Sequence, residues 1–489
     1  MMRDRVKFFV YAIIWAIVLL VVVRVIDKVL EPKYTYSNST YPMTSTYNGF
    51  YDMDRDSVDV LILGSSVCVN GISPQDIYDE CGIRSYNLSS EQQSMVVSYY
   101  WLKEALRRQS PQVVVLDSRF LFPRHMTTPL NMDEPILRKS VDPMHMSLNK
   151  LSMITDICTL DESQDVNSYI FTGVRFHSRR QELEPQDYYL GKKCSNALKG
   201  YYPLSYTGNP DYEPYISSGS DAKPEDSGYE PVMREYLDKI VELCGENNIK
   251  LMITALPGPE MNDSINSLLL SYEDENVRFY NFAEKTLYDE VGLEGYESIL
   301  NHANIWGAQK LSKRIAHILA DDYGVASVGD SQWEESRDEA YQIMNGANLT
   351  VATDGADYLN RLSGYDYTVF MELCGGDVNC INCDMEEMLV KMGMTDCGAG
   401  PSFIGIINCD EGTINMSDES YASFEGSFGA HLHSYDIRSS ASDPDYDRIE
   451  IDGEDYSIDG ARGLQVVVYD NIQDKVVDSA CITGDGLMR

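Results

Sequence analysis

The chain has 489 residues, of which 77 are acidic and 39 are basic, so its formal net charge is −38 at pH 7. This length is too great for one ordinary core and predicts two or three domains. Hydrophobic residues make up 43% of the chain and charged residues 24%, which excludes a wholly disordered protein. The acidic excess excludes nucleic acid as a partner, because nucleic-acid binding needs a basic surface. It also argues against docking on anionic lipid through a charged face.

The acidic residues are concentrated in the last third of the chain. Residues 331–489 contain 31 acidic and 8 basic side chains, whereas residues 1–330 contain 46 and 31. This change in composition predicts a domain boundary near residue 330, with a linker over 326–337.

An apolar segment near the N-terminus predicts a membrane anchor. Residues 8–23 are an unbroken apolar run, and with Arg24 and Lys28 reaching the interface the segment is about 20 residues long, enough to span a bilayer. Basic residues before the run place the N-terminus in the cytoplasm and the rest of the chain outside the cell membrane. A cleaved signal peptide is the alternative, but no small-residue cleavage site follows. We therefore interpret residues 1–30 as a signal anchor of a single-pass protein and residues 31–56 as a tether.

The eleven cysteines fit an exported protein, and their odd number leaves at least one unpaired. The sequence does not choose among the pairings. Cys380 and Cys383 have the spacing of a zinc knuckle, but no second pair accompanies them, so a disulfide or free thiols are favoured over zinc. We expect neither a metal nor an organic cofactor.

Residues 57–325 alternate short β-branched runs with helical segments, which predicts an α/β domain with a doubly wound parallel sheet. Ser73 followed by Pro74 marks a helix N-terminus. Residues 120–232 break the alternation and are interpreted as an insertion that caps the sheet. The predicted strands are 58–63, 85–88, 112–117, 249–256 and 277–282, and the predicted helices are 73–80, 92–108, 147–158, 233–248 and 307–320.

Two residues at the carboxyl edge of this sheet, where doubly wound folds bind ligands, are candidates for catalysis. Ser66 directly follows the first strand, where N–H groups at a helix entry can stabilise an oxyanion. A serine nucleophile needs a base, and His302 lies in a loop that returns to the same edge just before the closing helix. The alternatives are a plain turn with a helix cap at Ser66 and a surface histidine without a role. We interpret His317, on the closing helix, as a packed core or boundary residue.

Five short blocks follow one another in a characteristic order: Asp59–Ser66, Ile72–Pro74, Tyr86–Leu88, Val113–Asp117 and His302–Lys310. Their order and spacing resemble those of the SGNH/GDSL hydrolases over about residues 45–325. The similarity is greatest to the membrane-anchored bacterial branch of the D-alanyl-lipoteichoic acid and alginate O-acetylation proteins. It implies a flavodoxin-like sheet, with Ser66 as nucleophile and His302 as general base on an ester, through an acyl-enzyme. For oxyanion or supporting roles we single out four residues, namely Val67, Asn87, Ser89 and Asn304.

Several positions depart from the pattern of that family, and its third-block asparagine is not recognisable around Leu256–Pro259. Val67 stands where this branch has histidine, and Ser89 or Glu91 stands where it has a glycine of the oxyanion hole. Ile299 stands where it has the aspartate that orients the histidine, and loss of that acid costs a serine hydrolase on the order of 10⁴ in rate.

Two hypotheses about function therefore stay open. The first is a membrane-anchored extracytoplasmic esterase or O-acyltransferase that acts on a cell-envelope glycan or acylated polymer through a Ser–His acyl-enzyme. The second is a catalytically inactive envelope protein that binds glycan or a membrane O-acyltransferase partner.

Residues 338–489 predict a smaller, acidic, β-rich domain with one helix. The stretch Ala461–Asp470 with Val477–Ser479, and the blocks Tyr367–Met371 and Ser402–Ile406, are similar to the interleukin-like EMT-inducer domain. That similarity implies a compact extracellular β-sandwich-like module that contacts glycans or proteins. The predicted strands are 349–353, 367–371, 402–407, 463–469 and 476–481, of which the last two form a hairpin, and the predicted helix is 384–394.

An acidic stretch in this domain approaches the spacing of a calcium loop. Asp443–Asp447 and Glu454 supply acids at the required positions, but Arg448 stands where such a loop needs glycine. A solvated acidic loop is therefore the favoured interpretation, with weak calcium binding as the alternative.

Overall fold

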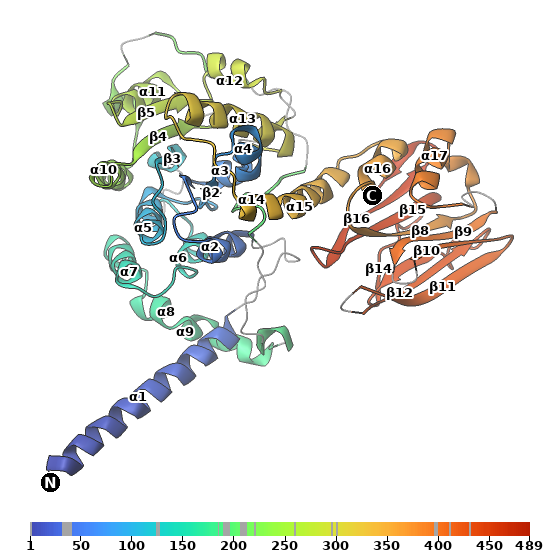
Figure 1. Ribbon diagram of the computed structural model, residues 1–489, viewed down its shortest axis with the longest axis horizontal. Helices are drawn as coiled ribbons and strands as arrows, with labels where there is room; N and C mark the ends of the chain where they lie inside the picture. Colours follow the sequence, from blue (N-terminus) through green and yellow to red (C-terminus); the bar gives the residue numbers. More distant parts are fainter. Residues whose placement is uncertain are drawn as a thin grey trace. The chain divides into compact units, whose positions relative to one another are not determined.

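The computed structural model divides the chain into two compact units (Figure 1). Unit 1 comprises residues 1–202 and 208–335, and unit 2 comprises residues 203–207 and 336–489. The structure describes residues 2–31, 42–123, 128–183, 185–188, 196–205, 213–219, 222–258, 261–294, 297–299, 302–395, 400–409, 412–429 and 432–489.

Unit 1 begins with the apolar helix α1 (Met2–Leu30). Its segment Val6–Leu30 has a mean hydropathy of 2.8 and is long and apolar enough to cross a membrane. The last turns of α1 contact α9 (Thr172–Phe176). There the Asp27 carboxylate accepts a hydrogen bond from the Gly173 backbone N–H at 2.9 Å, and Arg24 Nη1 donates to the Ile170 carbonyl at 2.6 Å.

Helix α2 (Pro42–Asp52) corrects the prediction of a tether over residues 31–56. Tyr47 and Phe50 lie one helical turn apart, and both are fully buried. The Tyr47 ring stacks on Trp101 with centroids 4.3 Å apart, and Phe50 meets Tyr86 edge to face at 5.3 Å. Burial of these aromatic rings outweighs the polar composition, so α2 belongs to the core of unit 1. Residues 32–41 lie outside the described part of the chain.

The centre of unit 1 is a five-stranded sheet in the order β2-β1-β3-β4-β5, in which all neighbouring strands are parallel. This confirms the predicted parallel α/β sheet. Nearly all residues of the three central strands are buried, as expected for a sheet covered on both faces. The strands are β1 (Val60–Leu63), β2 (Ser85–Asn87), β3 (Val113–Asp117), β4 (Lys250–Ala255) and β5 (Val277–Asn281).

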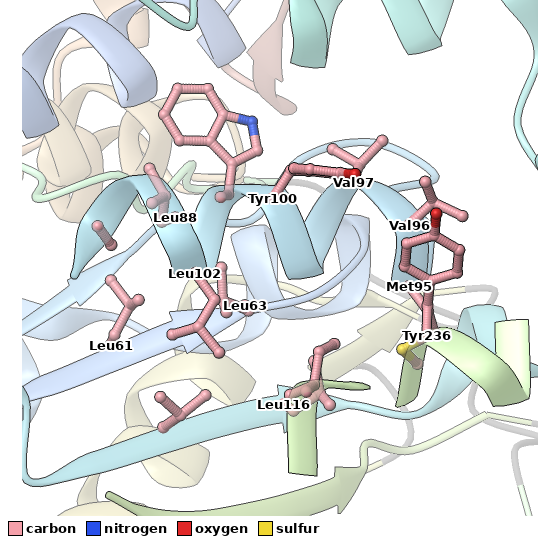
Figure 2. Close-up of a cluster of buried hydrophobic side chains, with 14 of the residues drawn as sticks. Leu61, Leu63, Leu88, Met95, Val96, Val97, Tyr100, Leu102, Leu116 and Tyr236 are labelled. Carbon is pink, nitrogen blue, oxygen red and sulfur yellow. The ribbon is translucent and has the colours of Figure 1, made fainter. Parts of the chain in front are cut away.

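Helices cover the two faces of this sheet (Figure 1). Helices α5 (Met95–Ala105) and α10 (Pro231–Glu246) pack on each other over one face, where Figure 2 shows Leu61, Leu63 and Leu116 of the sheet beneath α5. Helices α4 (Pro74–Cys81) and α13 (Ile305–Asp321) pack together on the other. The predicted cap is present, because Ser73 Oγ accepts a hydrogen bond from the Asp76 N–H at 3.3 Å.

The remaining helices of unit 1 connect these layers. The described part of the predicted insertion is mainly helical, with α6 (Glu134–Val141), α7 (Leu148–Leu160), α8 (Val166–Ile170) and α9. The others are α3 (Ser66–Gly71), α11 (Asp263–Leu270), α12 (Lys285–Val291) and α14 (Ser331–Glu335). Helix α14 falls within the predicted linker 326–337, but its Trp333 is fully buried and stacks on Tyr78 at 5.4 Å, so this part of the linker is folded onto unit 1.

Unit 2 contains two antiparallel sheets. The first has the order β10-β9-β8-β15-β16-β17 and the second β11-β12-β13-β14. Their strands are β8 (Tyr367–Cys374), β9 (Ser402–Cys409), β10 (Gly412–Asp418), β11 (Tyr421–Phe428), β12 (His433–Ser440), β13 (Arg448–Ile451), β14 (Glu454–Asp455), β15 (Gly463–Asp470), β16 (Lys475–Thr483) and β17 (Gly486–Met488). The hairpin predicted near the C-terminus is β15–β16.

Alternate residues of β8 face two separate cores of unit 2. Val369 and Met371 join the core under helices α16 (Gly355–Leu362) and α17 (Cys383–Lys391), whereas Phe370 joins the core between the two sheets.

Two predictions for unit 2 are wrong. Residues 349–353, predicted as a strand, begin at the last residue of helix α15 (Arg337–Leu349) and continue past its end, and unit 2 has α15 and α16 besides the one predicted helix. Gln342, Asn345 and Leu349 of α15 are buried at spacings of three and four residues, and this helical periodicity outweighs the short β-branched run that follows. The acidic stretch 443–447 lies between the antiparallel strands β12 and β13.

We predict that Phe50→Ala lowers the free energy of unfolding of unit 1 by about 3–5 kcal/mol, because it leaves a cavity under α2. All four tryptophans, Trp15, Trp101, Trp306 and Trp333, lie in unit 1. Urea unfolding of the detergent-solubilised full chain, followed by tryptophan fluorescence, therefore reports on this unit. The exposed Asp54 gives the control Asp54→Ala, for which we expect less than about 0.5 kcal/mol. Equal stability of the two variants would contradict the assignment of α2 to the core.

Candidate active site

Ser66 is the first residue of α3, directly after β1. The connecting residue Gly64 has no room for a side chain, because a Cβ there would lie 2.5 Å from Asp117 Cβ and 3.1 Å from Cys68 Sγ. This close approach allows the chain to turn from a buried strand into a helix within two residues. Ser66 itself is partly exposed at the carboxyl edge of the sheet, in the position expected from the sequence.

Asp117, the last residue of β3, holds this turn in place. One carboxylate oxygen accepts hydrogen bonds from Ser65 Oγ at 2.7 Å and from the Ser65 backbone N–H at 3.3 Å. The other oxygen accepts from the Arg119 backbone N–H at 3.1 Å. Burial raises the pKa of Asp117, while the Arg119 charge and these hydrogen bonds act in the opposite direction.

His302 is far from Ser66 in the sequence of unit 1 but next to it in space. It lies on β7 (His302–Ala303), which pairs with β6 (Ser298–Ile299) immediately before α13. His302 Nε2 and Ser66 Oγ are 2.7 Å apart and share a hydrogen bond, although 236 positions separate the two residues. This is the geometry of a nucleophile and its general base.

The surroundings of His302 favour the neutral imidazole. Burial, together with the nearby Arg119 charge, lowers the pKa of His302 to about 4. Within the described residues no carboxylate is hydrogen-bonded to the second ring nitrogen, so the imidazole is oriented by its place on β7 and its bond to Ser66. Ile299 pairs with His302 through the backbone.

The four predicted supporting residues have different positions. Val67 is buried in the first turn of α3 and lines a small apolar pocket with Leu256 and Ala303. Asn87 Nδ2 donates to the carbonyls of Cys68 and Ile72 at 2.8 and 2.9 Å, and so holds the middle of α3 and its C-cap. The other two lie apart from the Ser66–His302 hydrogen bond: Ser89 is fully buried beside Cys68, and Asn304 Oδ1 caps α13 by accepting from the Gly307 N–H at 3.2 Å.

The other described histidines make contacts away from this site. His317 is exposed and its Nε2 lies 3.0 Å from Glu80, so it is not a packed core residue. The remaining three are His145, stacked on Tyr51, His177, bonded to the Val174 carbonyl, and His433, between Asp452 and Asp474. His125 and His431 lie outside the described residues.

Eight cysteines, including Cys380 and Cys383, are free thiols. The side chains of Cys194, Cys397 and Cys409 lie outside the described part of the structure. Across the described ranges, no group of three or more His, Cys, Asp or Glu side chains is arranged to hold a metal ion.

The sequence reasoning missed Asp117 and Arg119. The signal available for Asp117 was its place at the carboxyl end of a predicted strand, beside the end of the strand that leads to Ser66. Arg119 lies two residues further along and lines an open pocket with Ser118, Leu256 and Met261. Only the tertiary structure places its charge near His302.

Comparison with models of known protein families finds no match to this chain, and comparison with curated proteins finds none either.

We predict that Asp117→Ala lowers the free energy of unfolding of unit 1 by about 2–4 kcal/mol, because it leaves the buried Ser65 donors unpaired. Ser65→Ala removes only the hydroxyl bond and is expected to cost about 1 kcal/mol. Urea unfolding followed by tryptophan fluorescence measures both changes. If the two variants were equally stable, Asp117 would not be the residue that holds the turn.

Proposed function

We propose that this protein is a serine-dependent ester hydrolase or O-acyltransferase, anchored in the cell membrane, that acts outside it on a cell-envelope glycan or acylated polymer. The observation that carries the proposal is the 2.7 Å hydrogen bond between Ser66 Oγ and His302 Nε2. Ser66 begins helix α3 at the carboxyl edge of the parallel sheet, and His302 lies on β7. Among the described histidines, only His302 is hydrogen-bonded to Ser66.

In the proposed reaction His302 removes the proton of Ser66 as Oγ attacks the acyl carbon of the ester. The electron pair of the carbonyl moves to its oxygen, and the N–H groups that open α3, at Ser66 and Val67, are the nearest candidates to stabilise the oxyanion. Collapse of this intermediate expels the alcohol, which takes the proton from Nε2, and leaves an acyl group on Ser66. Water or an acceptor hydroxyl then takes the acyl group by the reverse sequence.

The resemblance to the SGNH/GDSL hydrolases supports this reading at the level of the fold. The strand order 2-1-3-4-5 agrees with a flavodoxin-like sheet. The serine after β1 and the histidine before α13 agree with the order of the family's blocks.

The missing aspartate makes a Ser–His dyad, rather than a triad, the form of this site. A neutral imidazole can accept the serine proton without a carboxylate, but the imidazolium that forms is then less stabilised, so the rate is lower. We therefore expect a slow enzyme. If the site no longer turns over a substrate, the second function remains, an envelope protein that binds glycan or an O-acyltransferase partner. The resemblance of unit 2 to the interleukin-like EMT-inducer domain suits such binding.

Helix α1 supports the proposed location. Its length and hydropathy suit a single span. With the basic residues at the start of the chain in the cytoplasm, units 1 and 2 would both face the cell envelope.

We predict that a fluorophosphonate labels the full-length protein at Ser66 and that Ser66→Ala abolishes the label. His302→Ala should slow labelling at least about 10³-fold, because the serine then loses its base. The exposed Ser152 on α7 gives the control Ser152→Ala, which should label like the wild type. Labelling that persists in Ser66→Ala, or no labelling together with binding of an envelope glycan, would favour the second function.

We predict an unusual pH dependence of kcat/KM for a neutral ester such as 4-nitrophenyl acetate. Because the pKa of His302 is lowered to about 4, the base stays neutral well below the usual range, and activity is lost only as the pH falls towards 4. The rate should change less than about twofold between pH 6 and 8. An acid limb near pH 6.5, the ordinary value for histidine, would contradict the lowered pKa of His302.

A further inference from the structure

The last turns of α1 are bonded directly to the insertion of unit 1. Besides the hydrogen bonds that α1 makes with the Ile170 carbonyl and the Gly173 N–H, the Leu30 carbonyl accepts one from Arg179 Nη1 at 2.8 Å. These partners follow one another from the end of α8, through α9, to the short 3₁₀ helix η2 (His177–Gln181). The end of the apolar helix is therefore fastened at three successive points.

Gly173 allows α9 to lie directly against α1. A Cβ at this position would overlap the Asp27 carboxylate, which accepts the hydrogen bond from the Gly173 N–H. Figure 1 shows α9 beside the C-terminal end of α1. The level of α9 along α1 is thus fixed by backbone contact.

The length of α1 determines where this contact lies relative to a membrane. A hydrocarbon core of about 30 Å takes about 20 residues of α-helix. A span that begins at Phe8, after the basic residues of the N-terminus, therefore ends near Asp27. Because α9 is bonded to α1 at this level, it would lie in the interface between hydrocarbon and water, not above the membrane.

Helices α8 and α9 present apolar side chains at this level. Val174, in the middle of α9, is 54% exposed, and Val166, the first residue of α8, is 42% exposed. Phe171 and Phe176, at the two ends of α9, are half-buried, and the Arg24 guanidinium lies over the Phe171 ring at 5.6 Å. Apolar and aromatic side chains next to cations are typical of segments that lie in a membrane interface.

The cations around α9 are paired with acids of the protein itself. The ion pairs, with N–O distances of 2.6 to 3.7 Å, are Arg24 with Asp27, Lys28 with Glu31, Arg175 with Asp142, and Arg179 with Asp187. A membrane contact of this kind depends on apolar area and needs no excess of positive charge. It is compatible with the net charge of −38, which argues against charge-driven binding to anionic lipid.

We propose that α8 and α9 form a second membrane contact of this protein, in which they lie in the bilayer interface beside the end of α1 and Val174 reaches the acyl chains of phospholipids. The occupant is lipid because the exposed apolar face continues the lipid-facing surface of α1, where Val25 and Ile26 are 43% and 50% exposed at the same level. The inference rests on the proposed anchoring by α1 and goes beyond it, because it holds unit 1 on the membrane surface.

The test follows quenching of tryptophan fluorescence by brominated lipids, which act only at close range. The full-length protein is reconstituted in phosphatidylcholine nanodiscs with and without bromine on the acyl chains. Trp15 on α1 is first replaced by phenylalanine, and the other three tryptophans give the baseline. In this background we expect Val174→Trp to add fluorescence of which about half or more is quenched, with bromines near the ester end of the chains acting more strongly than those near the methyl end.

Leu270, which is 45% exposed on α11, gives the matched control. Helix α11 lies far from α9 within unit 1 (Figure 1), so the fluorescence added by Leu270→Trp should not be quenched. Gly173→Val should reduce the quenching of Val174→Trp, because its side chain pushes α9 away from Asp27. Urea unfolding checks that unit 1 stays folded in each variant. Replacing part of the phosphatidylcholine by phosphatidylglycerol should change nothing, since the cations are paired.

The failures of the two proposals are distinguishable. If bromine does not quench Trp15, measured as the difference between the wild-type chain and Trp15→Phe, the proposed anchoring fails. If Trp15 is quenched and Val174→Trp is not, the anchoring stands and the inference is overturned. A blue-shifted but unquenched emission of Val174→Trp would then show that a second copy or another protein covers α9. Quenching that requires phosphatidylglycerol would also overturn the inference, because charge and not apolar area would make the contact.

Discussion

The hydrogen bonds from Ser65 to the buried Asp117 carboxylate are the interaction on which the candidate site depends. They join the carboxyl ends of two neighbouring parallel strands, β1 and β3, at distances of 2.7 and 3.3 Å. A buried carboxylate without such donors would be costly, so the turn and the acid stabilise each other. Gly64 is part of the same arrangement, because any side chain there would overlap Asp117. Ser66 is exposed towards His302 because the residues just before it are held so tightly.

Electrostatics gives the site its particular character. In a Ser–His–Asp triad the carboxylate orients the histidine and stabilises its charged form. Here the charge close to His302 is that of Arg119, which has the opposite effect. Asp117 does not take the place of the missing acid, because its oxygens are bonded to Ser65 and to the Arg119 backbone.

The acidic residues of the chain are unevenly distributed between the two units. Residues 331–489, nearly all of which lie in unit 2, contain 31 acidic and 8 basic side chains, whereas the longer stretch 1–330 contains 46 and 31, so the acidic excess is denser in unit 2. Unit 2 is a pair of antiparallel sheets with two cores, and its acids lie largely at exposed or half-buried positions such as Glu425, Asp443 and Asp485. It has the features of a separate module joined to unit 1.

The sequence by itself determined the parallel sheet, the helix caps such as Ser73, the apolar helix α1 and the pairing of Ser66 with His302 as candidates. These features follow from local patterns: continuous apolar runs, a cap before a proline, and residues that follow strands or precede a helix. Other features were decided only by the tertiary structure. The sequence of α2 resembles a polar tether, and only the packing of Tyr47 on Trp101 and of Phe50 on Tyr86 places it in the core. Residues 349–353, predicted as a strand, instead lie at the end of α15 and just after it. The bonds of Asp117 and the charge of Arg119 near His302 arise from contacts between distant segments, which no local pattern encodes, because hydrogen bonds and charges act through space and not along the chain.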